Sequence, residues 1–438
     1  MTPRPQRPPL IRRMRLAIRR TPEALLAAAR EQGHIIQLGI GPKRLVILSE
    51  PAAVEQVLRV QHGRFTKGKA HTRARGWLGQ GILVSEGDEH HRQRRLLVRA
   101  LAPQRVAAHS DAMVRRAEQL AERWQDGETR DIWQDMLHLA VANIAAAIWG
   151  EDVDVDIPML SDALEQLATW LNQGGSPLVA LRDRLPLPEH RATQRVRAWL
   201  DALIDTLTER HRHSQADTIL SSLLQSGDPL VTPSFIHDQL LTLLLGGRET
   251  SGTALTWTWH LIASHTEIQA QIHAELDRAL AGRTPTMADI EHMPYLENVI
   301  REVLRMYPPA WSTVRRAHES CRIGETHIPA GAVVVMSQYV LHRDPRWFAQ
   351  PDQFQPERWD GDGPACPKGA YIPFGMGPRR CIGEGFAWAE IMLTIAAIAQ
   401  RWHLEALPDQ RITLRPSTSL QPAHGITLRV ARRSQRTV

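Results

Sequence analysis

The sequence predicts a mainly α-helical protein with a small β portion and one long central helix. Aliphatic residues recur at helical spacing over most of the 438-residue chain. A run that starts at Thr232-Pro233 continues to about His265 and is apolar on most sides, which is typical of a helix in the middle of a domain. The chain is 43% hydrophobic but only 5% Phe, Trp and Tyr, so its core must be mainly aliphatic.

The first elements have clear start and stop signals. Thr21 followed by Pro22 predicts a helix start, because a capping hydroxyl precedes a proline in the first turn, and Gly33 predicts its end. Residues 35–40 and 44–48 are rich in Ile and Val and are separated by a Gly-Pro pair, which predicts a β-hairpin. Pro51 then begins another helix.

The predicted secondary structure changes in the last third of the chain. Short extended pieces are expected at residues 313–317 and 332–336, followed by a loop rich in Pro and Gly and a last helix from Cys381 to about Arg401. No internal repeat or low-complexity linker interrupts the pattern. We therefore expect residues 21–438 to form a single domain.

Residues 1–20 form a basic N-terminal arm. They contain no apolar run long enough to cross a membrane or to form a signal-peptide core. Leu10, Met14 and Ile18 share one helical face with arginines opposite, so one interpretation is weak contact with an anionic membrane surface. A solvated arm is the interpretation that we favour.

Charge and cysteine content exclude some functions. The formal charge of +6 suits acidic partners, but no basic tract is interleaved with aromatic residues, so we expect no nucleic-acid binding. The three cysteines are scattered and form no C-x-x-C pair, which argues against a disulfide framework and a zinc site. A reducing cytoplasm is the expected compartment.

Residues 374–383, FGMGPRRCIG, place a cysteine among glycines and arginines. Glycines permit a tight turn and close approach of the backbone to a flat cofactor. We expect Cys381 to begin a helix, where unpaired N–H groups stabilise a thiolate, and Arg379 to meet a carboxylate of the same cofactor. On the loop chemistry alone, a buried structural cysteine is an equally good interpretation.

This segment resembles the haem-binding motif of the cytochrome P450 family, F-x-x-G-x-R-x-C-x-G. Every fixed position matches: Phe374, Gly377, Arg379, Cys381 and Gly383. The resemblance extends from about residue 20 to the C-terminus and implies the cytochrome P450 fold, with the long helix over haem b (iron protoporphyrin IX). It implies that Cys381 is the thiolate ligand of the haem iron in a monooxygenase. Cys321 and Cys366 lie in no comparable setting and are expected to be structural.

Two further motifs agree with this resemblance. Glu302 and Arg305 match the family's E-x-x-R, and their spacing puts both on one helical face. Residues 354–359, FQPERW, are similar to F-x-P-E-R-F, with Trp in place of the last Phe. The resemblance implies that Glu302, Arg305 and Arg358 form a buried charge network behind the haem, which serves folding and haem retention.

Residues 87–95 resemble the family's W/H-x-x-x-R helix start. The match implies that His90 and Arg94 bind haem propionates. The doubled histidine leaves His91 with Arg95 as the alternative register. Without the other motifs, each of these side chains would be interpreted as a solvated cation.

Arg315 occupies the place of another propionate-binding arginine of the family, and the adjacent Arg316 is its competitor. A dicarboxylate cofactor in an apolar pocket needs several convergent positive donors. The resemblance therefore implies that Arg315 and Arg379 share this role with the donors near residue 90.

Residues 246–251, GGRETS, interrupt the long helix and are similar to the family's A/G-G-x-D/E-T-T/S. Two glycines weaken the helical ladder and open space beside a ligand, and an acid followed by a hydroxyl provides a proton route. Taken alone, the segment would be a helix kink with a solvated Glu249. With the cysteine loop present, Glu249 and Thr250 are the expected catalytic pair for O₂ activation. Arg248 is placed to pair with Glu249 and to tune it.

The chain carries no flavin, nicotinamide or iron–sulfur fingerprint, so electrons are expected from separate proteins, such as a ferredoxin and its NAD(P)H-dependent reductase. The expected docking surface is the basic side near Arg92, Arg95 and Arg380, unless these arginines are merely solvated. A peroxide-driven hydroxylase of the same fold is the nearest alternative, but the Glu249-Thr250 pair argues against it. A non-catalytic haem sensor or carrier is the alternative from another class.

The substrate is expected to be an apolar small molecule. The candidate pocket segments are largely aliphatic, and Trp77, Trp170 and Trp311 either line the pocket or fill the core. Residues 308–317 resemble bacterial family members that act on fatty acids or carotenoid-like terpenoids. A steroid or a polyketide is the alternative.

Overall fold

The computed structural model describes residues 21–40, 43–172, 188–361, 363 and 366–433. The basic arm, residues 1–20, lies outside the described residues. The described residues fall into two compact units: those between 21 and 69 and between 301 and 381 form one, and those between 70 and 300 and between 382 and 433 form the other. Helices dominate and the sheets are small, which confirms the predicted fold class.

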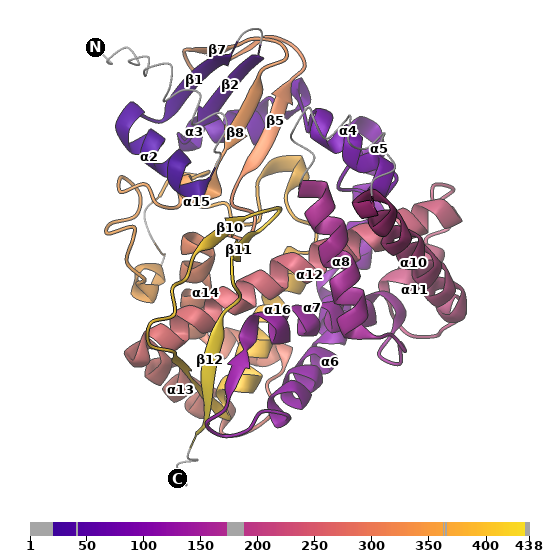
Figure 1. Cartoon of the computed structure of the whole chain (residues 1–438), viewed down its shortest axis with the longest axis vertical. Helices are drawn as coiled ribbons and strands as arrows, with labels where there is room; N and C mark the ends of the chain where they lie inside the picture. Colours follow the sequence, from indigo (N-terminus) through magenta and orange to yellow (C-terminus); the bar gives the residue numbers. More distant parts are fainter. Residues whose placement is uncertain (1–20, 41–42, 173–187, 362, 364–365, 434–438) are drawn as a thin grey trace. The chain divides into compact units, whose positions relative to one another are not determined.

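A five-stranded sheet organises the first unit, with the strand order β1-β2-β8-β5-β3. The predicted hairpin is present, because β1 pairs antiparallel with β2 (Figure 1). Strand β2 pairs parallel with β8, which pairs antiparallel with β5. The elements of this unit are α2 (Pro22–Gln32), β1 (Ile35–Ile40), β2 (Lys43–Leu48), α3 (Pro51–Glu55), η1 (Gln56–Val60), η2 (His62–Arg64), β3 (Phe65–Thr66), β5 (Thr313–Ala317), β6 (Cys321–Ile323), β7 (Thr326–Ile328), β8 (Val333–Met336), α15 (Gln338–Leu341), η5 (Pro356–Trp359) and η6 (Gly377–Arg379).

The N-terminal helix follows its local sequence signals. The Thr21 hydroxyl accepts the N–H of Ala24 at 3.3 Å, and Pro22 occupies the first turn. The helix ends at Gly33, whose φ of +88° lies in the region that favours glycine. Both predicted boundaries of α2 are confirmed.

Helix α12 (Pro233–Ser264) is the centre of the second unit, as predicted. It is 32 residues long and is capped by the Thr232 hydroxyl, which accepts the N–H of Phe235 at 3.2 Å. It packs against five other helices, namely α7, α8, α10, α13 and α16, which explains why it is apolar on most sides. The helices of this unit are α4 (Lys69–Leu78), α5 (Gly87–Ala100), α6 (Pro103–Glu122), α7 (Ile132–Trp149), α8 (Ile157–Asn172), α10 (Pro188–His211), α11 (Ile219–Leu224), α12, α13 (Thr266–Leu280), η4 (Met287–His292) and α16 (Glu384–Ala399), and α14 (Pro294–Met306) contributes residues to both units.

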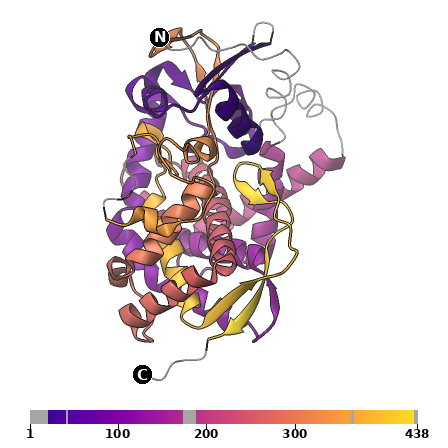
Figure 2. The ribbon, with the colours of Figure 1, turned by 90° about the vertical axis from the view of Figure 1, so that its left-hand side faces the viewer.

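Short strands from distant parts of the chain complete the second unit. Strand β12 (Thr427–Arg432) pairs antiparallel with β4 (Thr129–Asp131) and with β9 (Trp402–Ala406), so yellow and magenta strands lie side by side in Figure 2. Strands β10 (Leu414–Pro416) and β11 (Leu420–Pro422) form a separate hairpin. Among the described helices, none combines the length and the apolar composition that crossing a membrane requires.

Candidate active site

The loop that carries Cys381 is fixed by the backbone of the first unit. The amide of Cys381 donates to the carbonyl oxygen of Phe374 at 2.9 Å, which closes the loop on itself. Gly377 has a φ of +73°, and a Cβ at this position would lie 2.1 Å from the carbonyl oxygen of Leu58. Only glycine fits such an approach, so Gly377, the first fixed glycine of the motif, sets the path of the chain toward Cys381.

The three cysteines form no disulfide and lie in different settings. Cys321 is buried and Cys366 is half-buried, and burial raises the pKa of both thiols. Cys381 is exposed, so its sulfur is accessible to a metal ion. The expectation that Cys381 begins the last helix is wrong, because α16 begins at Glu384 and Gly383 is its N-cap. The loop, rather than the first turn of a helix, holds the thiol.

The predicted charge network lies on α14 and η5 of the first unit. Arg305 donates to Glu302 through Nε at 2.8 Å and Nη2 at 2.9 Å, and both side chains are fully buried. Arg358 adds a bond from Nε at 3.1 Å. Trp359, where the family has Phe, donates its indole N–H to Glu302 at 3.0 Å, so this departure from the pattern adds a donor. Two guanidinium groups and an indole N–H therefore donate hydrogen bonds to one buried carboxylate.

This network continues to the start of the cysteine loop through His342, a residue that the sequence did not single out. Arg305 donates from Nη1 to the carbonyl oxygen of His342 at 2.8 Å, and the His342 Nε2 accepts the amide of Ile372 at 2.9 Å. Burial, reinforced by the charge of Arg305, lowers the pKa of His342 to about 3. The imidazole is therefore neutral near pH 7 and can act as an acceptor. The charge network and the loop are parts of one hydrogen-bonded assembly.

Helix α5 of the second unit separates the two possible registers of the W/H-x-x-x-R motif. His90 is buried and Arg94 is half-buried, one turn apart on the same face. His91 and Arg95 are both exposed. A cofactor held in the interior would meet the face of His90 and Arg94.

Arg315 and Arg316 point to opposite faces of β5 in the first unit, as successive residues of a strand do. Arg316 packs over backbone glycines, with its Cβ 3.2 Å from the place that a Cβ on Gly68 would take. Arg315 donates to the carbonyl oxygen of Val314 at 2.9 Å. The two arginines therefore serve different faces, and only one of them can face a given ligand.

Helix α12 has an opening on one face at the predicted catalytic segment. Gly246 and Thr250, one turn apart, are exposed, although this part of the helix is otherwise largely buried. The Thr250 hydroxyl donates to the Gly246 carbonyl oxygen at 2.6 Å, and a Cβ on Gly246 would have no neighbour within 4 Å. Gly247 differs, because a Cβ there would lie 2.9 Å from Ile144 of α7. Gly246 thus leaves space on the exposed face of α12, and Gly247 permits close packing of α12 against α7.

Glu249 faces away from this opening and is only 4% exposed. Its Oε1 accepts from the Ser419 hydroxyl at 2.7 Å, the Ser419 amide at 3.1 Å and the Gln421 amide at 2.7 Å. The Thr418 hydroxyl lies 2.7 and 2.6 Å from the two carboxylate oxygens. The hairpin β10–β11 therefore surrounds Glu249 with neutral donors, and no local signal in the sequence predicts this contact.

The expectation that Arg248 pairs with Glu249 is wrong. Arg248 donates to Glu165 at 2.9 Å and to Ser161 at 3.0 Å, both on α8. Successive residues of a helix point in directions about 100° apart, so Arg248 and Glu249 meet different neighbours. Glu165 also accepts from Arg415 at 3.1 Å, and this carboxylate satisfies both arginines.

Within each unit, the residues present fit a flat iron cofactor with two carboxylates. The first unit offers one exposed thiol and two half-buried arginines, Arg315 and Arg379. At Gly375, φ is +75° and a Cβ would meet no atom within 4 Å, so the loop leaves room for a ring. The second unit offers a buried imidazole beside a half-buried guanidinium, and a helix face opened by Gly246. A thiolate for iron and cations for carboxylates are the donors that haem requires.

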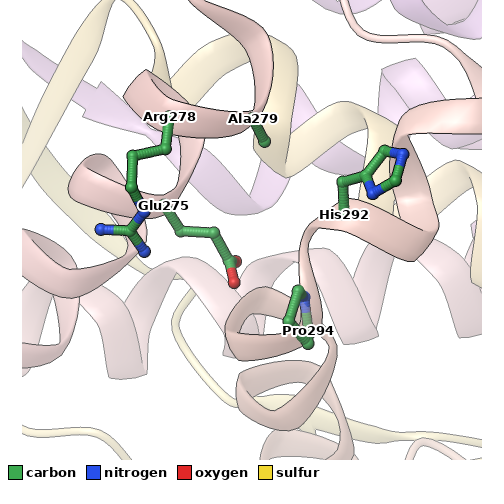
Figure 3. Close-up of a pocket in the computed structure, with 5 residues that line it drawn as sticks. All are labelled: Glu275, Arg278, Ala279, His292 and Pro294. Atoms are coloured by element: carbon green, nitrogen blue, oxygen red, sulfur yellow. The ribbon is translucent and has the colours of Figure 1, made fainter.

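A surface pocket elsewhere in the second unit contains none of the predicted residues. Its lining includes Glu275, Arg278 and His292, and Figure 3 shows the Glu275 side chain extending toward Pro294. Glu275 accepts the amides of Tyr295 at 2.7 Å and Leu296 at 2.9 Å, so it caps the start of α14. Burial raises the pKa of Glu275, against these hydrogen bonds, which lower it. The carboxylate serves the helix, and we assign no catalytic role to this pocket.

Comparison with known proteins identifies the class. The family model of cytochrome P450 matches residues 3–430, so the chain belongs to the cytochrome P450 family. The protein is accordingly a P450 monooxygenase, an oxidoreductase with haem b as its cofactor.

Relatives with assigned names cover most of the chain. Cyclooctatin synthase of Streptomyces melanosporofaciens is 34% identical over 414 residues, which are 92% of this chain and 90% of that protein. Pentalenene oxygenase of Streptomyces avermitilis is 30% identical over 397 residues, 89% of this chain and 88% of that protein. Among solved structures, retinoic acid-bound cyanobacterial CYP120A1 has a TM-score of 0.82 at 24% identity and covers 93% of both chains, which confirms the fold.

Proposed function

We propose that this P450 monooxygenase hydroxylates or epoxidises a terpenoid, with Cys381 as the residue that would hold its haem iron and with electrons supplied by separate proteins. The observation that carries this proposal is Cys381, the exposed thiol in a loop that the protein itself fixes. When bound, haem with a thiolate ligand supplies the O₂ activation and O–O cleavage of the reaction. We further propose that residues 21–438 act as one catalytic domain.

The thiolate assignment has a direct spectroscopic test. The purified ferrous protein with CO should show the red-shifted Soret band that thiolate-ligated haem gives. Cys381→His should lose this band while retaining haem, and Cys366→Ser, at a half-buried thiol, is the control that should keep it. A red-shifted band in Cys381→His would refute the assignment.

We propose that His90, Arg94, Arg315 and Arg379 bind the haem propionates. The burial of the first pair, and the packing of Arg316 on the other face of β5, support these choices over their neighbours. A guanidinium held near a carboxylate makes a charge-assisted hydrogen bond, so its loss should weaken haem binding. Haem transfer to apomyoglobin should be faster for Arg94→Gln than for the control Arg95→Gln, and equal rates would exclude this register.

We propose that Glu249 and Thr250 deliver protons during O₂ activation. Thr250 lies on the opened face of α12 and its hydroxyl is held by Gly246, while Glu249 is buried one residue earlier. Thr250→Ala should therefore divert electrons from product to peroxide. Thr258→Ala is the matched control, because this buried hydroxyl of the same helix likewise donates to the carbonyl oxygen four residues earlier. Unchanged coupling in Thr250→Ala would refute this role.

A terpenoid substrate is supported by the relatives and by one aromatic pair. The name of pentalenene oxygenase specifies a terpene hydrocarbon. In the second unit, Trp77 and Trp170 are half-buried with ring centroids 4.2 Å apart, a surface that suits an apolar molecule. Trp311, by contrast, is buried and belongs to the core. A screen of terpenes, fatty acids and steroids for the substrate-induced Soret shift tests this, and a shift with fatty acids or steroids alone would refute it.

We propose that a ferredoxin and its NAD(P)H-dependent reductase supply the electrons, one at a time, in a reducing cytoplasm. Arg92, Arg95 and Arg380 are exposed, which suits an acidic carrier. Reduction by a ferredoxin should slow with rising ionic strength and with Arg92→Glu. Rates that ignore both changes would remove these arginines from the docking surface, and efficient turnover with peroxide alone would favour a peroxygenase.

A further inference from the structure

Glu249 is enclosed, so its protons must come through a residue that touches it. The carboxylate is 4% exposed, and the contacts given above all come from the hairpin β10–β11. A buried carboxylate that gives up a proton in each reaction cycle must be reprotonated from water. The groups that surround it therefore decide how fast it recovers.

Only one of the three side chains that hold Glu249 is exposed. Ser419 and Gln421 are each 1% exposed, whereas Thr418 lies at the exposed tip of the hairpin. A Gln amide does not exchange protons readily, but a hydroxyl is both a donor and an acceptor. Thr418 is therefore the member of the set that joins water to the carboxylate.

The geometry at Thr418 suits transfer rather than simple support. Its hydroxyl lies within 2.7 Å of both carboxylate oxygens, and it also accepts the amide of Asn172 at 3.5 Å. Gln421 is itself fixed, because its carbonyl oxygen accepts from Arg415, which also binds Glu165. The carboxylate is thus held still while one exposed hydroxyl bridges its two oxygens.

We propose that Thr418 relays protons from solvent to Glu249, while Ser419 and Gln421 position the carboxylate. Water gives a proton to the Thr418 oxygen as the Thr418 hydroxyl proton passes to a Glu249 oxygen. Protonation weakens the charge-assisted hydrogen bonds to the hairpin, so the neutral carboxyl can turn toward the opened face of α12 and release that proton toward Thr250, which restores the carboxylate and moves one proton inward. This inference rests on the proposed role of Glu249 and Thr250. All three hairpin residues act through Glu249 and are positioning residues rather than catalytic ones.

The first test needs no turnover. Infrared spectra of the resting holoprotein contain the carboxylate stretch of Glu249, identified by its absence from Glu249→Gln. Thr418→Val, which keeps the shape and removes the hydroxyl, should shift this band, and Thr418→Ser should restore it. Thr413→Val, an exposed threonine near the base of the same hairpin, should leave it unchanged. An unshifted band in Thr418→Val would overturn the contact on which the relay depends.

The second test separates relay from support. With a substrate found by the Soret screen, Thr418→Val should lower coupled turnover at least about tenfold, less than the roughly 10²-fold of a lost direct donor, because water partly replaces the hydroxyl. Its solvent isotope effect should rise, and Thr418→Ser should recover both values. A shifted infrared band with unchanged coupling and isotope effect would overturn the relay but leave the role of Glu249 intact. Unchanged coupling in Thr250→Ala as well would instead refute the proposed role of the Glu249–Thr250 pair, on which the relay rests.

Discussion

The buried carboxyl group of Glu390 leads us to predict that the free energy of unfolding of this protein falls as the pH rises through neutrality. The side chain lies on α16, is fully buried, and accepts from the Asn143 amide at 2.9 Å. Burial raises its pKa from 4.5 to about 7, against hydrogen bonds with Ser251 and Asn143 that lower it. The folded protein therefore holds a proton on Glu390 at pH values where the unfolded chain has released it.

The sign and size of this pH effect follow from the difference between the pKa values of Glu390 in the folded and unfolded states. Between pH 4.5 and about 7 the folded state binds more protons than the unfolded state, so the free energy of unfolding decreases with rising pH. The contribution is fully present below pH 4.5 and is lost above about pH 7. At about 1.4 kcal/mol for each pKa unit, the total is about 3 kcal/mol.

The change that tests this reasoning is Glu390→Gln, because an amide resembles the protonated acid. We expect the variant to match the wild type near pH 4 and to exceed its free energy of unfolding by up to about 3 kcal/mol at pH 8. Urea unfolding followed by tryptophan fluorescence at several pH values measures the difference. Glu267→Gln, at an exposed carboxylate on α13, is the control that should show no such trend. A constant difference between wild type and Glu390→Gln across this range would refute the reasoning.

Three other changes follow from the cysteine loop and its supports. Glu302→Gln should cost about 3–5 kcal/mol in the free energy of unfolding, because it leaves Arg305 buried without its counter-charge, and haem content per protein should fall with it. Gly377→Ala should cost at least about 2 kcal/mol in the same free energy of unfolding. Gly282→Ala is the control and should cost less, because Gly282 has a similar φ of +81° but a Cβ there would have no neighbour within 4 Å. Equal losses would exclude the contact with Leu58. His342→Asn should lower the free energy of unfolding by about 2 kcal/mol less at pH 5 than at pH 7. The reason is that the lowered pKa of His342 makes the wild type lose stability as the pH falls below 6.5. A cost that does not change with pH would contradict the neutral imidazole.

Local signals explain what the sequence predicted well. The caps at Thr21 and Thr232 act on amides three residues away, so both helix starts follow from adjacent residues. The E-x-x-R pair is equally local, since helical spacing alone brings Glu302 and Arg305 together. In each case the interacting groups lie within one turn of the chain, so the local sequence is enough to predict the contact.

Contacts between distant residues explain what the sequence did not predict. Glu249 meets Thr418, which is 169 positions away, and Arg248 meets Glu165, 83 positions away. Adjacent charges on a helix looked like partners, but their side chains leave the helix in different directions. The start of α16 was placed three residues early, because the motif that marks Cys381 carries no cap signal for a helix.

The support of the cysteine loop also bears on the exchange of the cofactor. The contacts described for this loop are its own backbone bond between Cys381 and Phe374, the bond from Ile372 to His342 at its start, and the close approach of Gly377 to Leu58, all of which involve protein groups. The loop is therefore part of the scaffold and does not depend on the identity of the metal. Porphyrins that carry a different metal should find the same thiol in the same place, which makes this chain a suitable host for cofactor replacement.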